Sequence, residues 1–348
     1  MSSKTKKKHI KKRVNKTKKM KHQKTFSVKN LDFNSHYPSI GVLSIPMTIG
    51  KHKYTHSYIP ASYIKWIEMN HGRVIPIPYD TPRGAIDMIL NQVNGILFIG
   101  GQVDNHMIKE EYITFMETFE YIFNHAKKSN NQGNYYPIFS ICLGMEILGM
   151  MSIGSSKVIK DYVNMDGISN VKARNNNSKL KFVKINNKLG KLFSKEEQDI
   201  LQNTPCVFQN HGFGFLKDKP YMKKWTKSWD IVATSKSTDK KDEYISMFEY
   251  KKFPFYGMQF HPEKVLFEWE VETIGREKIF RQMSNKLSLF FINECKKNTN
   301  VVNFPKLYIK NYNLWSRGET MQKIQPNKKL FKNNKSSFEN SYYFDILS

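Results

Sequence analysis

The stretch Tyr136–Met150, YPIFSICLGMEILGM, places a cysteine directly between a predicted strand and a predicted helix. β-Branched and aromatic residues in Pro137–Ile141 indicate a buried strand. From Met145 onward the apolar residues follow a helical spacing, so strand and helix are separated by only three residues. This junction is typical of a strand within a sheet that leads into a helix packed on that sheet, and it restricts the fold to classes that combine both elements.

Cys142 is the residue at this junction. The N–H dipoles at a helix start favour a thiolate, and a tight turn after a strand lifts the side chain clear of the sheet, as in a nucleophile elbow. The alternative is a buried core cysteine, which is the commoner fate of a free cysteine. This stretch alone leaves both interpretations open.

The chain before this junction alternates between strands and helices. Strands are predicted at 39–45, 73–79 and 95–99, and helices from residue 60, over 83–91 and over 108–128. Two prolines favour an edge or an end of a strand for 73–79. This alternation predicts an α/β fold with a mainly parallel central sheet in a three-layer α/β/α arrangement. Because ligands bind outside the carboxyl ends of such strands, Gly100-Gly101 and Cys142 are candidates for one crevice.

The second half of the chain is richer in predicted strands. We expect strands at 206–210, 231–235, 244–250 and 255–260, and a closing amphipathic helix over 277–296. Residues 47–58 are expected to form a loop, and residues 301–348 show little periodicity. We therefore predict a basic arm at 1–35, one α/β domain at 36–298 and an Asn/Lys-rich tail at 299–348.

The net charge of +26 is concentrated near the start of the sequence. Residues 1–24 hold 12 of the 56 Lys and Arg residues and no acidic residue. They lack the apolar segment of a secretory signal, so we predict a disordered arm that is either a solvated tail or a contact for nucleic acid or an anionic surface. No run approaches the roughly 18 apolar residues of a membrane span. The three cysteines do not make a disulfide framework, and an intracellular location is expected, in the cytoplasm or the nucleus.

A cysteine nucleophile needs a base, a group that orients the base, and donors for the oxyanion. His261 stands at a predicted strand end, and Glu263 is placed to orient its ring as the third member of a triad. The Leu143 N–H and an N–H of Gly100 or Gly101 are candidate oxyanion donors. Each signal is weak by itself, since a single histidine at a strand end is more often structural.

Three segments in order resemble the γ-glutamyl hydrolases, a branch of the class I glutamine amidotransferase-like superfamily. They are 94–101 (NGILFIGG), 140–146 (SICLGME) and 256–264 (YGMQFHPEK), and the likeness extends over about residues 38–298. Residues 58–65 (YIPASYIK) and Glu268-Trp269 add to it. The resemblance implies a flavodoxin-like three-layer fold and a cysteine peptidase that needs no metal or organic cofactor.

The resemblance also implies roles for individual residues. Cys142 would attack a γ-glutamyl amide and form a thioester, with His261 as the base and Glu263 as its orienting group. Glu146 stands where amidotransferases have glutamine, and it would pair with the α-amino group of the substrate. His211 and Tyr58 match positions that contact substrate or approach the reacting centre. Ser140 replaces a glycine that relieves crowding at the elbow, and Ile99 replaces a proline.

The leading hypothesis is hydrolysis of folyl- or antifolyl-poly-γ-glutamates. One alternative is a hydrolase for another γ-glutamyl amide, because the residues that read the leaving group are not identifiable from the sequence. Another is a degenerate hydrolase scaffold that binds nucleic acid through residues 1–24. A homodimer is possible, and the sequence does not distinguish endo- from exo-cleavage.

Overall fold

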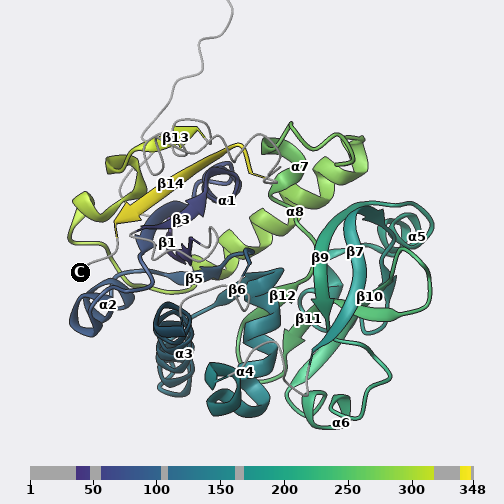
Figure 1. Cartoon of the computed structure of the whole chain (residues 1–348), viewed down its shortest axis with the longest axis horizontal. Coiled ribbons are helices and arrows are strands. Elements are labelled where there is room, and N and C mark those ends of the chain that lie inside the picture. Colours follow the sequence, from purple (N-terminus) through teal and green to yellow (C-terminus); the bar gives the residue numbers. More distant parts are fainter. Residues whose placement is uncertain (1–36, 48–55, 103–108, 161–167, 317–337, 346–348) are drawn as a thin grey trace, which may run out of the picture. The chain divides into compact units, whose positions relative to one another are not determined.

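An eight-stranded sheet is the centre of the part of the chain that the computed structural model describes, which is residues 37–47, 56–102, 109–160, 168–316 and 338–345 (Figure 1). Its order is β4 (Arg73–Ile77), β1 (Ser39–Leu43), β5 (Gly95–Phe98), β6 (Ile138–Ile141), β12 (Phe255–Met258), β11 (Glu243–Tyr250), β10 (Trp229–Lys236) and β8 (Lys181–Phe182). The strands from β4 to β12 are parallel and the remainder are antiparallel. The predicted mainly parallel sheet is confirmed, as is the edge position of the strand that begins at Arg73.

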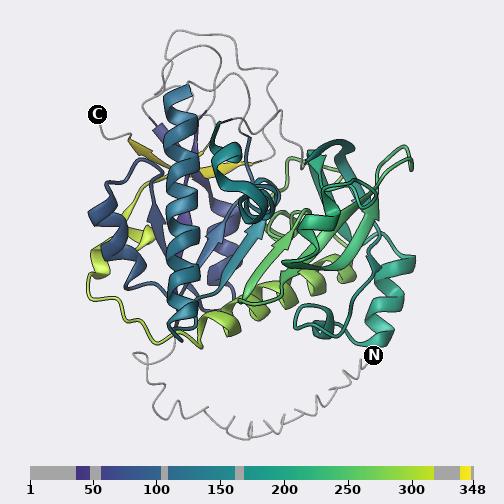
Figure 2. The same ribbon diagram turned by 90° about the horizontal axis from the view of Figure 1, so that it is seen from below.

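Helices cover both faces of this sheet (Figures 1 and 2). One face carries α2 (Arg83–Leu90), α3 (Lys109–Asn131) and α4 (Leu143–Lys160), and the other carries α1 (Ala61–Glu68) and α8 (Lys278–Cys295). On the α1 side, the ring of Phe139 in β6 lies 5.6 Å from that of Trp66 and 5.0 Å from that of Phe291. On the opposite side, Phe98 in β5 stacks on Phe119 of α3 at 3.7 Å. The three-layer α/β/α arrangement follows directly from these contacts.

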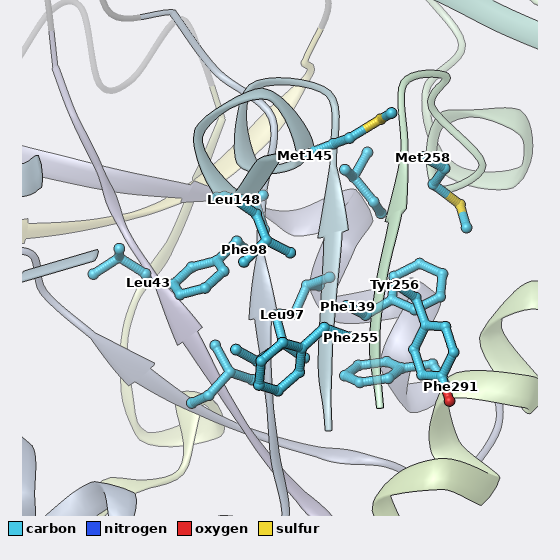
Figure 3. Close-up of a cluster of buried hydrophobic side chains, with 14 of the residues drawn as sticks. Leu43, Leu97, Phe98, Phe139, Met145, Leu148, Phe255, Tyr256, Met258 and Phe291 are labelled. Atoms are coloured by element: carbon cyan, nitrogen blue, oxygen red, sulfur yellow. The ribbon is translucent and has the colours of Figure 1, made fainter. Parts of the chain in front are cut away.

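The core between the layers is formed by large apolar side chains of the central parallel strands, shown in Figure 3. Leu97, Phe139 and Met258 are fully buried, and Leu148 of α4 packs with them. Strands covered on both faces need apolar residues on both, which explains their nearly continuous hydrophobic sequences. This packing holds β5, β6 and β12 side by side, so their carboxyl ends meet at one edge of the sheet.

A second sheet consists of β13 (Leu314–Ser316), β14 (Asn340–Asp345), β3 (His56–Pro60) and β2 (Ile45–Pro46). The sequence predicted a loop through residue 58 and a tail after residue 298, and both predictions differ from the structure here. β14 pairs antiparallel with β3 along its whole length. This pairing joins segments that are about as far apart as the described chain allows, so a local sequence pattern does not reveal the partner that satisfies their backbone groups.

A ribbon of β7 (Ser169–Ser178) and β9 (Val207–Gly214) lies next to the end of β12. β7 was not predicted because its sequence, SNVKARNNNS, is polar and rich in asparagine. The backbone N–H of His261 donates to the Phe208 carbonyl at 2.9 Å, which connects β9 to the end of β12. The shorter elements are α5 (Lys195–Asn203), α6 (Met222–Trp225), α7 (Lys264–Phe267) and the 3₁₀ turns η1 (Gly190–Leu192), η2 (Pro305–Leu307) and η3 (Ile309–Asn311).

Two sequence predictions concern regions beyond this description. The basic arm at 1–35, on which the nucleic-acid-binding alternative depends, lies outside the described residues and stays a prediction. Among the helices of the described segments, none has the length and apolar character needed to cross a membrane.

Candidate active site

Three loops meet at the carboxyl ends of β5, β6 and β12. They carry Gly100, Cys142 and His261, one residue from each loop. A Cβ atom placed on Gly100 would lie 2.9 Å from His261 Cε1 and 3.1 Å from Cys142 Cβ. The predicted nucleophile and base therefore both pack against this glycine, in the crevice expected for an open parallel sheet.

Cys142 forms a strained turn between β6 and α4. Its φ of 52° lies in the left-handed region, which costs a non-glycine residue about 1–3 kcal/mol and is typical of a nucleophile elbow. The Cys142 N–H donates to the Met258 carbonyl at 2.8 Å, and the Gly144 N–H donates to the Ile99 carbonyl at 3.2 Å. These bonds tie the elbow to the neighbouring loops and hold the strained conformation.

Ser140 does not crowd the elbow. Its hydroxyl donates to the Tyr256 carbonyl of β12 at 2.9 Å, and the side chain is fully buried there. The hydroxymethyl group that distinguishes serine from glycine therefore forms a hydrogen bond between the adjacent strands β6 and β12, two residues before the cysteine.

His261 and Glu263 form the predicted pair. His261 Nδ1 lies 2.7 Å from Glu263 Oε1, and the two side chains are 3% and 0% exposed. Burial lowers the pKa of His261, while the Glu263 carboxylate opposes that effect. With Nδ1 donating to Glu263, the neutral ring keeps Nε2 free of a proton, as a general base requires.

The thiol of Cys142 is not acidified in this structure. Burial raises its pKa, and the Glu146 carboxylate raises it further, whereas Lys264 and the Leu143 N–H act in the opposite direction. The predicted effect of the helix start is present as the contribution of the Leu143 N–H, but burial and the Glu146 carboxylate outweigh it. The resting pair is a neutral thiol beside a neutral imidazole, and the proton must move during attack.

The predicted oxyanion donors do not behave alike. The Gly100 N–H donates to the Tyr63 hydroxyl at 2.9 Å, so an oxyanion would have to compete with this hydroxyl for it. The Leu143 N–H interacts with the Cys142 sulfur. Gly101 follows next in the β5 loop and packs against Ile45. Leu143 together with Gly100 or Gly101 stays the prediction for the oxyanion donors.

Tyr63 is a site residue that sequence reasoning missed. Its hydroxyl lies 3.4 Å from His261 Nδ1 and also interacts with Glu263, while burial raises the pKa of Tyr63 well above its usual range. The sequence instead selected Tyr58, which lies in β3 with its ring 6.3 Å from that of Tyr343 in β14. The helical spacing of Tyr63, Trp66 and Ile67 was the available signal, because it places Tyr63 on the buried face of α1.

Glu146 and Gln259 form a buried polar pair beside the cysteine. Glu146 lies in the first turn of α4, and its Oε1 accepts a hydrogen bond from Gln259 Nε2 at 2.6 Å. Gln259 is fully buried, and its Oε1 has no partner among the described residues. A buried acceptor without a donor is costly, so this pair is suited to receive a ligand donor such as an ammonium group.

His211 lies in β9 with its ring held at both nitrogens. Nδ1 is 2.7 Å from the Phe213 carbonyl, and Nε2 is 3.0 Å from the side-chain amide of Gln209. Burial lowers the pKa of His211 to about 3, and nearby His261 and Arg174 contribute. His211 is therefore a neutral, oriented group at the edge of the site.

Within the described segments, no cluster of His, Cys, Asp and Glu residues could hold a metal ion.

Comparison with known proteins places this geometry in context. Residues 38–263 match the family model of peptidase C26. Gamma-glutamyl hydrolase 1 of Arabidopsis thaliana is 31% identical over 277 residues, which are 77% of this chain and 75% of that protein. The human gamma-glutamyl hydrolase is 28% identical over 84% of each chain. Among solved structures, a Thermoplasma acidophilum protein assigned to GMP synthase has a TM-score of 0.43 and 16% identity, covering 75% of this chain and 96% of its own.

Proposed function

Because the chain belongs to the peptidase C26 family, we propose that it hydrolyses the γ-glutamyl amide bonds of folyl- or antifolyl-poly-γ-glutamates through a thioester on Cys142. The observation that carries this proposal is the contact of Cys142 and His261 with the same glycine, together with the 2.7 Å bond from His261 to Glu263. Relatives named gamma-glutamyl hydrolase support the substrate class.

Acylation begins with attack of the Cys142 sulfur on the γ-carbonyl carbon. The thiol proton passes to Nε2 of His261, and the Leu143 and Gly101 N–H groups stabilise the oxyanion. When the carbon–nitrogen bond breaks, His261 gives this proton to the leaving amine. Glu263 keeps the imidazole oriented and stabilises its transient positive charge.

Deacylation reverses the roles of sulfur and water. A water molecule attacks the thioester carbonyl while His261 removes its proton. The carbon–sulfur bond then breaks, the γ-glutamyl product leaves as a carboxylic acid, and His261 returns the proton to Cys142. The cycle restores the neutral thiol and imidazole of the resting site.

Recognition of the glutamyl residue uses the buried pair beside the nucleophile. The α-ammonium group of the substrate would donate to Glu146 and to the unpartnered Oε1 of Gln259. Such an ammonium would also offset the charge of Glu146, which raises the pKa of Cys142. Substrate binding would thereby make proton transfer from the thiol easier.

The proposal is tested by incubating the protein with pteroyl-tri-γ-glutamate and analysing both products and protein. We expect shortened chains and, after acid quenching, a γ-glutamyl adduct on the peptide that contains Cys142. The peptides of Cys206 and Cys295, which are equally buried, serve as internal controls and should stay unmodified. An α-linked triglutamate is the control substrate. Absence of chain shortening, or an adduct on another cysteine, would contradict the proposal.

Replacing Glu263 by glutamine should change the pH dependence of hydrolysis in a defined direction. The Glu263 carboxylate raises the pKa of His261 against the effect of burial, so its loss lowers that pKa further. Neutral His261 is the active form, and activity is lost as the pH falls through its pKa. The acidic limb of kcat/KM should thus move to lower pH, while the plateau falls because the ring is less well oriented.

This prediction is checked by measuring kcat/KM from pH 4 to 8, roughly the range in which histidine titrates. Glu197→Gln, a substitution in the surface helix α5, is the control and should leave the profile unchanged. A limb that moves to higher pH in Glu263→Gln would show that His261 is not the group that titrates.

A further inference from the structure

An irregular segment of β7 lies opposite the part of β9 that passes the catalytic histidine. Ala173 pairs with His211 and Asn176 pairs with Gln209, so Arg174 and Asn175 together oppose the single residue Asn210. Asn175 has a φ of 47°, in the left-handed region. Two residues facing one form a β-bulge, a feature that often re-aims a side chain beside an active site.

The bulge directs the side chain of Arg174 over Gly212. A Cβ atom on Gly212 would lie 3.1 Å from Arg174 Nη2 and 3.5 Å from its Nε. Glycine therefore leaves the space that the guanidinium occupies. Arg174 is exposed, and no carboxylate in the described part of the chain forms an ion pair with it. Lys172, also exposed, differs because it pairs with Asp239 at 3.3 Å.

This guanidinium lies near the reacting centre. The Asn210 carbonyl interacts with His261 and raises its pKa, and Gly212 follows two residues later, about 7 Å along an extended strand. Arg174 and His261 both lower the pKa of His211, so both side chains lie close enough to act on the same imidazole. An accessible cation without a carboxylate partner thus stands at the His211 edge of the site.

We propose that Arg174 binds a carboxylate of the γ-glutamyl substrate and contributes to selecting anionic chains; this inference rests on the proposed function. A γ-linked chain keeps a free α-carboxylate on every glutamyl residue. A guanidinium binds such a group through two parallel N–H bonds and stays charged at every working pH. The bulge in β7 directs the Arg174 guanidinium toward this position, and the missing side chain of Gly212 leaves room for it.

The test measures binding rather than turnover. Tri-γ-glutamate is titrated calorimetrically into the Cys142→Ala protein, and into the same protein carrying Arg174→Ala, Arg174→Lys or Lys172→Ala. We expect Arg174→Ala to weaken binding about tenfold or more, as for loss of a charged hydrogen bond, and Arg174→Lys to weaken it less. Lys172→Ala removes the same charge two residues away and should change the affinity less than twofold.

A second ligand separates recognition from folding. The second ligand is tri-γ-glutamate in which the α-carboxylates are converted to carboxamides. The parent protein and Arg174→Ala should bind this ligand with the same affinity. The proposal would be overturned if Arg174→Ala and Lys172→Ala bound tri-γ-glutamate equally well. It would also be overturned if Arg174→Ala lost as much affinity for the carboxamide ligand as for tri-γ-glutamate, or if the parent protein did not bind tri-γ-glutamate. Failure of the proposed function is detected separately, as absence of chain shortening by the wild-type protein.

Discussion

Replacing Cys142 by alanine is expected to lower the turnover of pteroyl-tri-γ-glutamate by a factor on the order of 10⁴ or more, because no other group can form the thioester. The Cβ atom of Cys142 packs against Gly100, and the charges of Glu263 and Lys264, which follow His261, act on the pKa of its thiol. Alanine removes the sulfur and keeps the Cβ atom. The backbone bond from residue 142 to Met258 is unaffected, so folding should be preserved.

Product release is followed chromatographically at substrate concentrations above KM, and thermal unfolding of both proteins is compared. Cys206→Ala is the matched control, since Cys206 is 1% exposed and lies before β9, where its thiol faces the Ser178 and Leu201 carbonyls. It should keep turnover within about twofold, as expected for a residue outside the reacting unit. If Cys142→Ala turned over the substrate at the wild-type rate, Cys142 could not be the nucleophile.

Replacing Gly100 by alanine should reduce kcat by about a hundredfold or more, because misplacement of reacting groups by about 1 Å costs that much. The added methyl group would lie 2.6 Å from the Tyr63 hydroxyl, 2.9 Å from His261 Cε1 and 3.1 Å from Cys142 Cβ. These contacts are too short, so the nucleophile and the base must separate. Gly100 itself is buried, so the molecule cannot relieve the overlap by turning the methyl group into solvent.

Gly84→Ala is the control for this substitution. Gly84 lies at the start of α2, and a Cβ atom there would have no neighbour within 4 Å. Its activity should equal that of the wild type, and alanine should slightly favour the helix. Steady-state kinetics and thermal unfolding are measured for both variants. An active Gly100→Ala protein would mean that Cys142 and His261 do not work across this glycine.

The geometry of the candidate residues Cys142, His261 and Glu263 was predictable because their signals are local. A strand, a cysteine and a helix in immediate succession predicted the elbow, and its positive φ is the physical result of that abrupt turn. His261 and Glu263 are two residues apart, so one turn at a strand end brings the ring and the carboxylate together. The alternating pattern also predicted the parallel sheet, since apolar strands with interleaved helices have few other ways to bury their surfaces.

The partners of these residues were not predictable, because they come from distant segments. The Gly100 N–H donates to the Tyr63 hydroxyl of α1, a partner that the sequence did not indicate. Helix initiation predicted an acidic thiol, but burial and Glu146 decide its pKa. β14 pairs with β3 from the far end of the chain, where neither segment shows a strand pattern by itself.

The sequence by itself therefore determined the alternation of strands and helices in the parallel part of the sheet, and it indicated Cys142, His261 and Glu263 as candidates, because both signals are local along the chain. Only the tertiary structure decided which groups face them. Tyr63 beside His261, Gln259 beside Glu146 and Arg174 over Gly212 depend on packing between elements that are far apart in the sequence. The physical reason is that burial, charge and steric fit act through space, and a linear pattern records only the spacing along the chain.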